Sequence, residues 1–232
     1  MTDNLPPFLT EFNEAVKETE VFLSIARASE LQQDASEALE QLIPEIAEEK
    51  ARAVKDKNED YANMLLGCEC VAAALIAELK MWILLKQEEP DAAWDQLVSA
   101  QNASSAAARV HDGFSHLAIY HQRLEAIEQL VFPSQVFLSV GIIVKRLECS
   151  ICGYEYEDCE HLIGKPYMGQ FCSVIIHKAE LEEVSIVEKP ADKRCRIQHF
   201  STEGGSRNRM TWRIEKDGES SCEPGKARGR LM

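Results

Sequence analysis

Residues 149–161 read Cys-Ser-Ile-Cys-Gly-Tyr-Glu-Tyr-Glu-Asp-Cys-Glu-His, and this stretch decides how the second half of the chain can fold. It supplies the ligand set of a closed structural zinc site, three thiolates and one imidazole: Cys149, Cys152, Cys159 and His161. In the Cys-x-x-Cys half, two thiolates on a tight turn converge on one ion, and Gly153 then lets the chain reverse. Four protein ligands leave no open coordination position. We therefore predict a structural zinc ion, with a redox dithiol and unligated thiols as the alternatives.

Two more candidate ligands follow this loop. Cys172 and His177 are five positions apart on a predicted strand, where successive side chains alternate between the two faces. They should therefore point to opposite sides, and we do not predict a second complete metal site. Cys172 could still replace one of the four ligands above.

Composition and length indicate a globular protein. The chain has 232 residues, of which 45% are apolar, enough to bury a core in one large domain or two modest ones. It contains no run of about 18 apolar residues, and its first residues lack the basic and apolar regions of a signal peptide. We therefore expect a cytoplasmic protein with no membrane partner. In that compartment, eight cysteines favour metal ligands and buried thiols over disulfides.

The net charge of −14 is unevenly distributed along the chain. Residues 1–132 carry 10 Lys/Arg against 24 Asp/Glu, whereas residues 133–232 carry 15 of each. We therefore expect an acidic helical domain (1–132), a small β domain with the zinc loop (133–202) and a basic tail (203–232). The tail could contact nucleic acid or the acidic half of the chain, and a solvated, disordered end is the simpler interpretation.

The first half has the apolar periodicity of helices. Intervals of three and four residues predict four of them, over 8–27, 29–43, 61–87 and 92–132. Pro44 should kink the second helix or begin a new one, and Glu78 lies off the apolar stripe of the third. The last two helices are joined by a short break and must run antiparallel. Small side chains at 103–108 let another helix approach, either from this chain or from a second copy. We expect a protein partner or self-association through this domain.

Two groups of potential ligands fall within these helices. His111, His116 and His121 lie on the predicted helix 92–132, where steps of five residues turn each side chain by about 140° from the last. We therefore predict no shared metal or catalytic site. Cys68 and Cys70 point about 200° apart on helix 61–87 and should be small buried apolar residues.

The second half is rich in β-branched residues, which are typical of strands. We predict strands over 135–147, 171–177, 183–188 and 194–200, forming one small sheet around the zinc ion. Beyond Glu203 we expect disorder, apart from one transient apolar contact by 210–214. The predicted fold class is therefore α+β, an N-terminal antiparallel bundle of long helices followed by a small zinc-stabilised antiparallel β module.

Short segments of the second half match a known pattern. Residues 138–142 read Leu-Ser-Val-Gly-Ile, the cysteine segment follows, 164–169 read Gly-Lys-Pro-Tyr-Met-Gly, and 182–192 read Glu-Glu-Val-Ser-Ile-Val-Glu-Lys-Pro-Ala-Asp. Together they resemble the C-terminal part of tailed-phage prohead maturation proteases, over roughly 60 residues. In that family a Ser-Val-Gly-like strand carries the nucleophile, so the resemblance implies Ser139 for that position. The family also needs a histidine on β-structure before the serine, whereas the sequence before Ser139 predicts helices.

Two functions are consistent with these observations. The first is a non-enzymatic, zinc-stabilised interaction or adaptor protein that acts within a larger assembly connected with phages. The alternative, which the resemblance implies, is a serine protease in which Ser139 attacks a peptide carbonyl and a histidine acts as the base.

Overall fold

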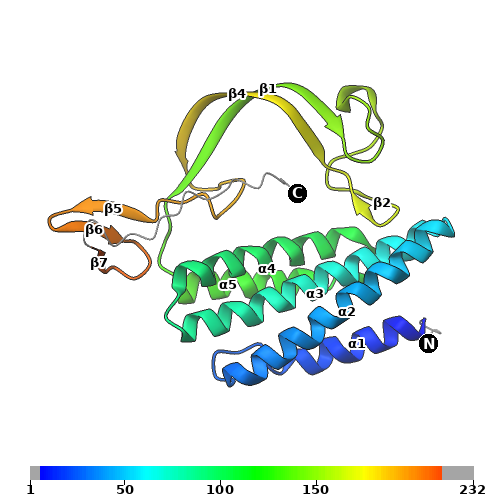
Figure 1. The fold of residues 1–232 in the computed structure, drawn as a ribbon, viewed down its shortest axis with the longest axis horizontal. Helices are drawn as coiled ribbons and strands as arrows, with labels where there is room; N and C mark the ends of the chain where they lie inside the picture. The colour runs from blue at the N-terminus through cyan, green and yellow to red at the C-terminus, as the bar shows by residue number, and fades with distance from the viewer. Residues whose placement is uncertain (1–5, 216–232) are drawn as a thin grey trace. The chain divides into compact units, whose positions relative to one another are not determined.

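The computed structural model describes residues 6–215, which form a mixed α+β fold (Figure 1). The chain divides into two units. One contains the residues up to Glu128 together with Lys165–Gln170, and the other contains Gln129–Gly164 and the residues from Phe171 onward. None of the described helices is long and apolar enough to cross a membrane.

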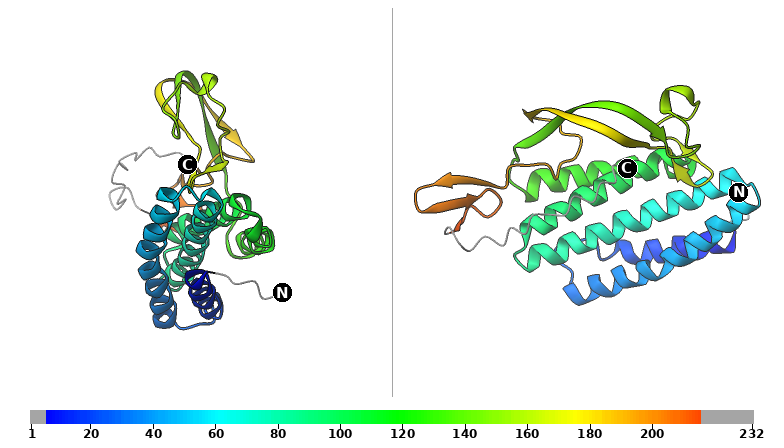
Figure 2. Two further views of the ribbon diagram at one scale, coloured as in Figure 1. Left: turned by 90° about the vertical axis from the view of Figure 1, so that its right-hand side faces the viewer. Right: turned by 45° about the horizontal axis from the view of Figure 1, so that its top comes forward.

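The first unit is built from the helices α1 (Pro7–Glu20), α2 (Ser29–Lys55), α3 (Glu59–Lys86) and α4 (Pro90–Val110), together with most of a fifth helix over Leu117–Val131. The central helix is α3, which packs against both α2 and α4 (Figure 2). Its side chains are buried around most of its circumference, as expected of a helix that is apolar on every side. The α3–α4 pair is the predicted antiparallel hairpin.

Pro44 does not begin a new helix, which was one of its two predicted effects. The structure has one continuous helix, α2, with Pro44 inside it. The charged stretch after Pro44 still packs against the core, because Ile46 and Ala53 are buried. At the end of α2 the chain turns, and the Asn58 side chain accepts a hydrogen bond from the Tyr61 backbone N–H (3.2 Å), which caps the start of α3.

The prediction of one helix over 92–132 is wrong. Helix α4 ends at Val110, a short 3₁₀ turn η1 (Asp112–Phe114) follows, and α5 spans Leu117–Val131. The ring Nδ1 of His111 accepts the Gly113 backbone N–H (3.0 Å). Phe114 then packs on α3 at Gly67, where an added Cβ would lie 2.1 Å from the ring. The break between the helices therefore lies where Phe114 contacts α3.

The second unit is dominated by a two-stranded antiparallel ribbon of β1 (Phe137–Cys149) and β4 (Val174–Val187). The register runs from Phe137 opposite Val187 to Cys149 opposite Val174, with three irregularities along it. These irregularities fit the curvature of the ribbon in Figure 1, because bulges bend a strand. The predicted strands 171–177 and 183–188 are therefore parts of one strand.

The remaining strands form two further small sheets. Strands β2 (Pro166–Tyr167) and β3 (Gln170–Phe171) pair across a turn at Met168 and Gly169, both with positive φ. A sheet of three strands follows: β5 (His199–Thr202), β6 (Gly205–Asn208) and β7 (Ile214–Glu215). The prediction of one sheet around the ion is thus wrong.

The prediction of disorder beyond Glu203 is also wrong as far as residue 215. Two strands, β6 and β7, lie in this stretch. They are supported by Trp212, whose ring lies 5.7 Å from the Phe200 ring and 5.3 Å from the Arg207 guanidinium. Residues 216–232 of the predicted basic tail lie outside the described residues.

The two units differ sharply in their cores. The helical unit has a large apolar core built on α3. In the described part of the second unit, the buried apolar side chains are only Phe132, Phe137, Cys149 and Cys172. Two of these four are cysteines beside the predicted zinc loop, so this unit depends on something other than apolar burial.

Candidate metal centre

The predicted ligands begin where the ribbon strand β1 ends. Cys149 is the last residue of that strand and is completely buried. A tight turn follows, in which the Gly153 N–H donates to the Cys149 carbonyl (2.9 Å) and the Ile151 N–H points to the Cys149 Sγ (3.4 Å). Gly153 has a φ of 74°, the left-handed conformation that glycine adopts without strain. The turn brings Cys152 back toward Cys149.

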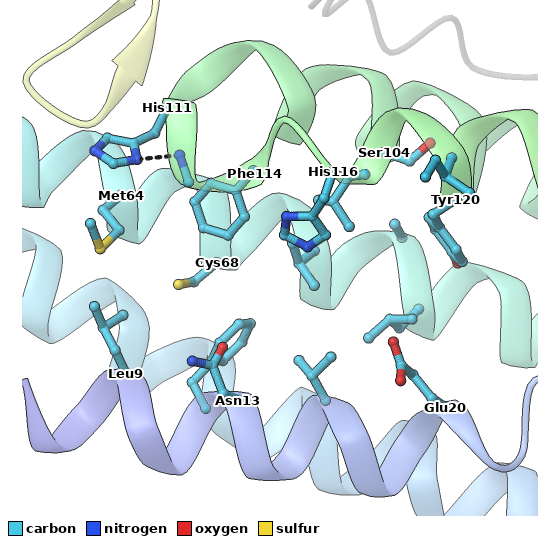
Figure 3. A pocket seen from close by; sticks show the side chains of 18 of the residues that line it. Leu9, Asn13, Glu20, Met64, Cys68, Ser104, His111, Phe114, His116 and Tyr120 are labelled. Carbon is cyan, nitrogen blue, oxygen red and sulfur yellow. Dashed lines mark hydrogen bonds between the residues drawn. The ribbon is translucent and has the colours of Figure 1, made fainter. Parts of the chain in front are cut away.

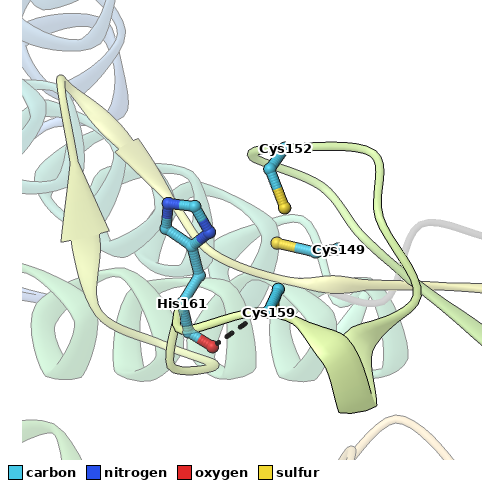
Figure 4. A group of neighbouring side chains, drawn as sticks. All are labelled: Cys149, Cys152, Cys159 and His161. Carbon is cyan, nitrogen blue, oxygen red and sulfur yellow. Dashed lines mark hydrogen bonds between the residues drawn. The ribbon is translucent and has the colours of Figure 1, made fainter.

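The other two predicted ligands come from the loop that returns toward the ribbon. A 3₁₀ turn, η2 (Tyr156–Asp158), leads into Cys159, which has an extended backbone. The four side chains converge, and one donor atom from each lies within 4.8 Å of all the others (Figure 4): Cys149, Cys152, Cys159 and His161. In residues 6–215 this is the one group of three or more His, Cys, Asp or Glu side chains arranged to hold a metal ion.

The electrostatics of the cluster favour a thiolate at its centre. Burial of Cys149 disfavours its charged form. The backbone groups of Cys152 and Ile151 and the thiols of Cys152 and Cys159 outweigh burial and lower the pKa of Cys149 to about 6. Burial and the neighbouring Cys149 instead raise the pKa of Cys159. Because sulfur and imidazole donors suit zinc, this donor set fits that metal.

Cys172 adjoins the cluster. It is 1% exposed, and its Sγ lies 3.8 Å from that of Cys149. Burial, followed by the interaction with Cys149, raises the pKa of Cys172 to about 11. His177 lies elsewhere on the ribbon, where its Nε2 is 2.7 Å from a carboxylate oxygen of Glu148. The sequence alone did not decide whether Cys172 is a ligand, and the structure places it beside the predicted ligands.

Ser139, the nucleophile implied by the resemblance, is half-buried in strand β1. Its partner in the register is Ser185, whose hydroxyl donates to Glu183 (3.2 Å). His177 lies eight positions from Ser185 along β4, about 26 Å at the rise of a strand. His199 contacts Asn208 (3.3 Å). Neither of these two histidine contacts involves Ser139.

The prediction that the three histidines of the helical unit lie on one helix is wrong. His111 lies at the end of α4, with Nε2 3.2 Å from Asp60 Oδ1. His116 is in the turn before α5, and His121 is on α5, where Nδ1 lies 3.0 Å from the Ser104 hydroxyl. They form no metal-binding group within the described residues.

Sequence reasoning missed a buried polar network and a cavity in the helical unit. Glu78, predicted to lie off the apolar stripe, is completely buried on α3. Both carboxylate oxygens accept hydrogen bonds from Arg123 (2.7 and 2.8 Å), and Tyr120 (2.8 Å) and Trp82 (3.0 Å) also donate. Burial, followed by the neighbouring Glu78, raises the pKa of Tyr120 well above its usual value, so the phenol stays a donor.

The cavity has a volume of about 600 Å³ and is lined mainly by α1, α3 and the segment after α4. Figure 3 shows apolar side chains such as Leu9 and Met64 on its walls, with Glu20 and His116 among the polar ones. Cys68 faces it, and burial raises the pKa of that thiol to about 12. Cys68 is thus a small buried side chain, as predicted, and it stays protonated at neutral pH.

Comparison with protein-family models, curated proteins and solved structures finds no match to this chain.

Proposed function

We propose that this chain is a non-enzymatic interaction protein in which a structural zinc ion stabilises a β unit that binds another protein chain. The observation that carries the proposal is the pairing of a thiolate cluster with a unit that has almost no apolar core. A closed structural zinc site contributes on the order of 10 kcal/mol to folding, enough to replace such a core.

The binding surface of the proposal is one face of the β1–β4 ribbon. Alternation along β1 puts Val140 and Ile142 on the same face, and the register places Val184 and Leu181 opposite them. Ile186 extends this face by one further pair. We call these five exposed side chains the ribbon patch: Val140, Ile142, Leu181, Val184 and Ile186.

The exposure of the ribbon patch supports a role in binding. Leu181 is 68% exposed and Ile186 is 71% exposed. A two-stranded ribbon is marginally stable by itself, and contiguous exposed apolar side chains mark interaction surfaces. The ribbon patch therefore adds a second surface to the expected partner contact through the helical unit.

Replacement of two patch residues should weaken binding without removing the metal. Each large apolar side chain contributes about 1.5 kcal/mol or more when buried, so Leu181→Gln with Ile186→Gln should lower affinity by about 100-fold. A photo-crosslinking amino acid at position 181, introduced in the cells that make the protein, identifies the partner. A crosslink from position 181 to a second copy or to another protein chain supports the proposal. The absence of any crosslinked protein contradicts it.

Action within a phage-related assembly is part of the proposal, and its support is the resemblance of 138–142, 164–169 and 182–192 to the prohead maturation proteases. The protease alternative makes a different prediction. A fluorophosphonate probe reacts with an activated serine, which needs an adjacent base. We expect no labelling of the zinc-loaded chain. Labelling that disappears in Ser139→Ala, with the ribbon still folded, would establish the protease instead.

A further inference from the structure

We propose that Cys172 is a ligand of the zinc ion, which is then held by four thiolates: Cys149, Cys152, Cys159 and Cys172. The inference rests on the proposed structural zinc site and specifies its ligands. His161 has a ring nitrogen within 4.8 Å of the Cys149, Cys152 and Cys159 sulfurs, and in this assignment it does not bind the metal.

The first support is the distance between two sulfur atoms. Cys172 Sγ lies 3.8 Å from Cys149 Sγ. Two thiolates on one tetrahedral zinc, each about 2.3 Å from the metal, are about 3.8 Å apart. A disulfide would bring the same atoms to about 2.0 Å. The pair is therefore spaced as two ligands of one ion.

The second support is the backbone that holds Cys172 in place. The Gly164 N–H donates to the Cys172 carbonyl (2.8 Å), which fixes the end of the returning loop. Next to Cys172, the Ser173 N–H donates to the Ser150 hydroxyl (2.8 Å), and the Ser150 N–H donates to the Ser173 carbonyl (2.9 Å). Cys172 is thus tied to both the Cys-x-x-Cys turn and the loop that carries Cys159.

The third support is the geometry of the second pair. Cys159 and His161 are separated by a single residue, which is shorter than the two to four residues typical of paired zinc ligands. The Cys159 Sγ also faces the His161 carbonyl at 3.9 Å. With Cys172 as the fourth ligand, from a separate backbone segment, Cys159 and His161 need not both bind the same ion.

This assignment changes what the metal does. The four predicted ligands all lie between the end of β1 and His161, so an ion held by them organises only that loop. Cys172 lies two residues before β4. If Cys172 binds the ion, the metal joins the end of β1 to the start of β4. The ion then holds together one end of the ribbon that carries the proposed binding surface.

X-ray absorption at the zinc edge tests the assignment on the full-length chain. We expect four sulfurs near 2.3 Å in the wild type and in His161→Ala, with zinc affinity in that variant lowered by about 10- to 100-fold. Cys172→His should show three sulfurs and one nitrogen, and Cys172→Ser should lose more affinity than His161→Ala.

The contrary results separate a failure of the Cys172 assignment from a failure of the zinc site. Three sulfurs and one nitrogen in the wild type, with the nitrogen lost in His161→Ala, overturn the role of Cys172 and leave the proposed structural zinc site intact. A wild-type chain that binds no zinc overturns both proposals. Because the wild-type and His161→Ala spectra separate these results, the test stands even where a cysteine variant fails to fold.

Discussion

Replacement of Cys149 by serine should abolish zinc binding and unfold the β1–β4 ribbon, while the helical unit stays folded. Cys149 is completely buried and lies at the centre of the cluster, 3.8 Å from one neighbouring sulfur. Its unit has four buried apolar side chains among the described residues, and two of them are cysteines of this site. The loss of a structural zinc ion, on the order of 10 kcal/mol, exceeds what so thin a core can supply.

Two measurements check this expectation. Elemental analysis should find about one zinc per wild-type chain and less than a tenth of that in Cys149→Ser, as expected when a structural ligand is removed. Hydrogen exchange should show loss of protection in β1 and β4 and unchanged protection in α3. Excess chelator should give the same exchange pattern with the wild-type chain.

Cys195→Ser is the matched control, because Cys195 is an exposed cysteine of the same unit. It should keep both the metal and the protection of the ribbon. If the ribbon amides of Cys149→Ser remain protected without bound metal, the proposed structural role of zinc is incorrect.

The Cys/His cluster could be predicted from the sequence because its chemistry is local. Cys149 to His161 span thirteen residues, and the spacing alone brings the donors within reach of one ion. Cys172 could not be assigned in the same way. The distance between Cys172 and Cys149 depends on the pairing of β1 with β4. Strand β4 itself is longer than the sequence predicted, because two predicted strands are one in the structure. Register between distant strands is set by the whole ribbon, and no short motif encodes it.

The helices were predictable from apolar periodicity, but their interruptions and buried charges were not. The break before α5 coincides with the packing of Phe114 on Gly67, a contact between η1 and α3. Glu78 lies off the apolar stripe in sequence, yet it is buried because Arg123, Tyr120 and Trp82 surround its carboxylate. Periodicity describes one helix at a time, whereas both features depend on a tertiary partner.

Replacement of Arg123 by methionine should lower the unfolding free energy of the helical unit by about 3 kcal/mol. The substitution leaves the buried Glu78 carboxylate without its counter-charge, and breaking a buried pair in this way costs about 3–5 kcal/mol. The lower end applies because the Arg123 side chain is 41% exposed, so water screens the pair. Hydrogen exchange of α3 amides in the zinc-loaded chain measures the change.

Arg52→Met is the matched control for this substitution. Arg52 forms an i,i+3 pair with Glu49 at 3.5 Å, and its side chain is 64% exposed. An exposed pair of this kind contributes at most about 1 kcal/mol, so the control should change α3 exchange only slightly. Equal effects of the two arginine substitutions would show that the buried carboxylate does not depend on Arg123.

A double-mutant cycle separates the charge effect from lost packing. Glu78→Leu removes the buried carboxylate, so adding Arg123→Met to it should cost much less than the 3 kcal/mol expected of Arg123→Met alone. Tyr120 and Trp82 lose an acceptor in both chains that carry Glu78→Leu, with and without Arg123→Met, so their contribution cancels in the comparison. If the two substitutions instead add, Arg123 stabilises the helices through its contact with the Leu23 carbonyl (2.7 Å) and its packing, and the ion pair with Glu78 contributes nothing of its own.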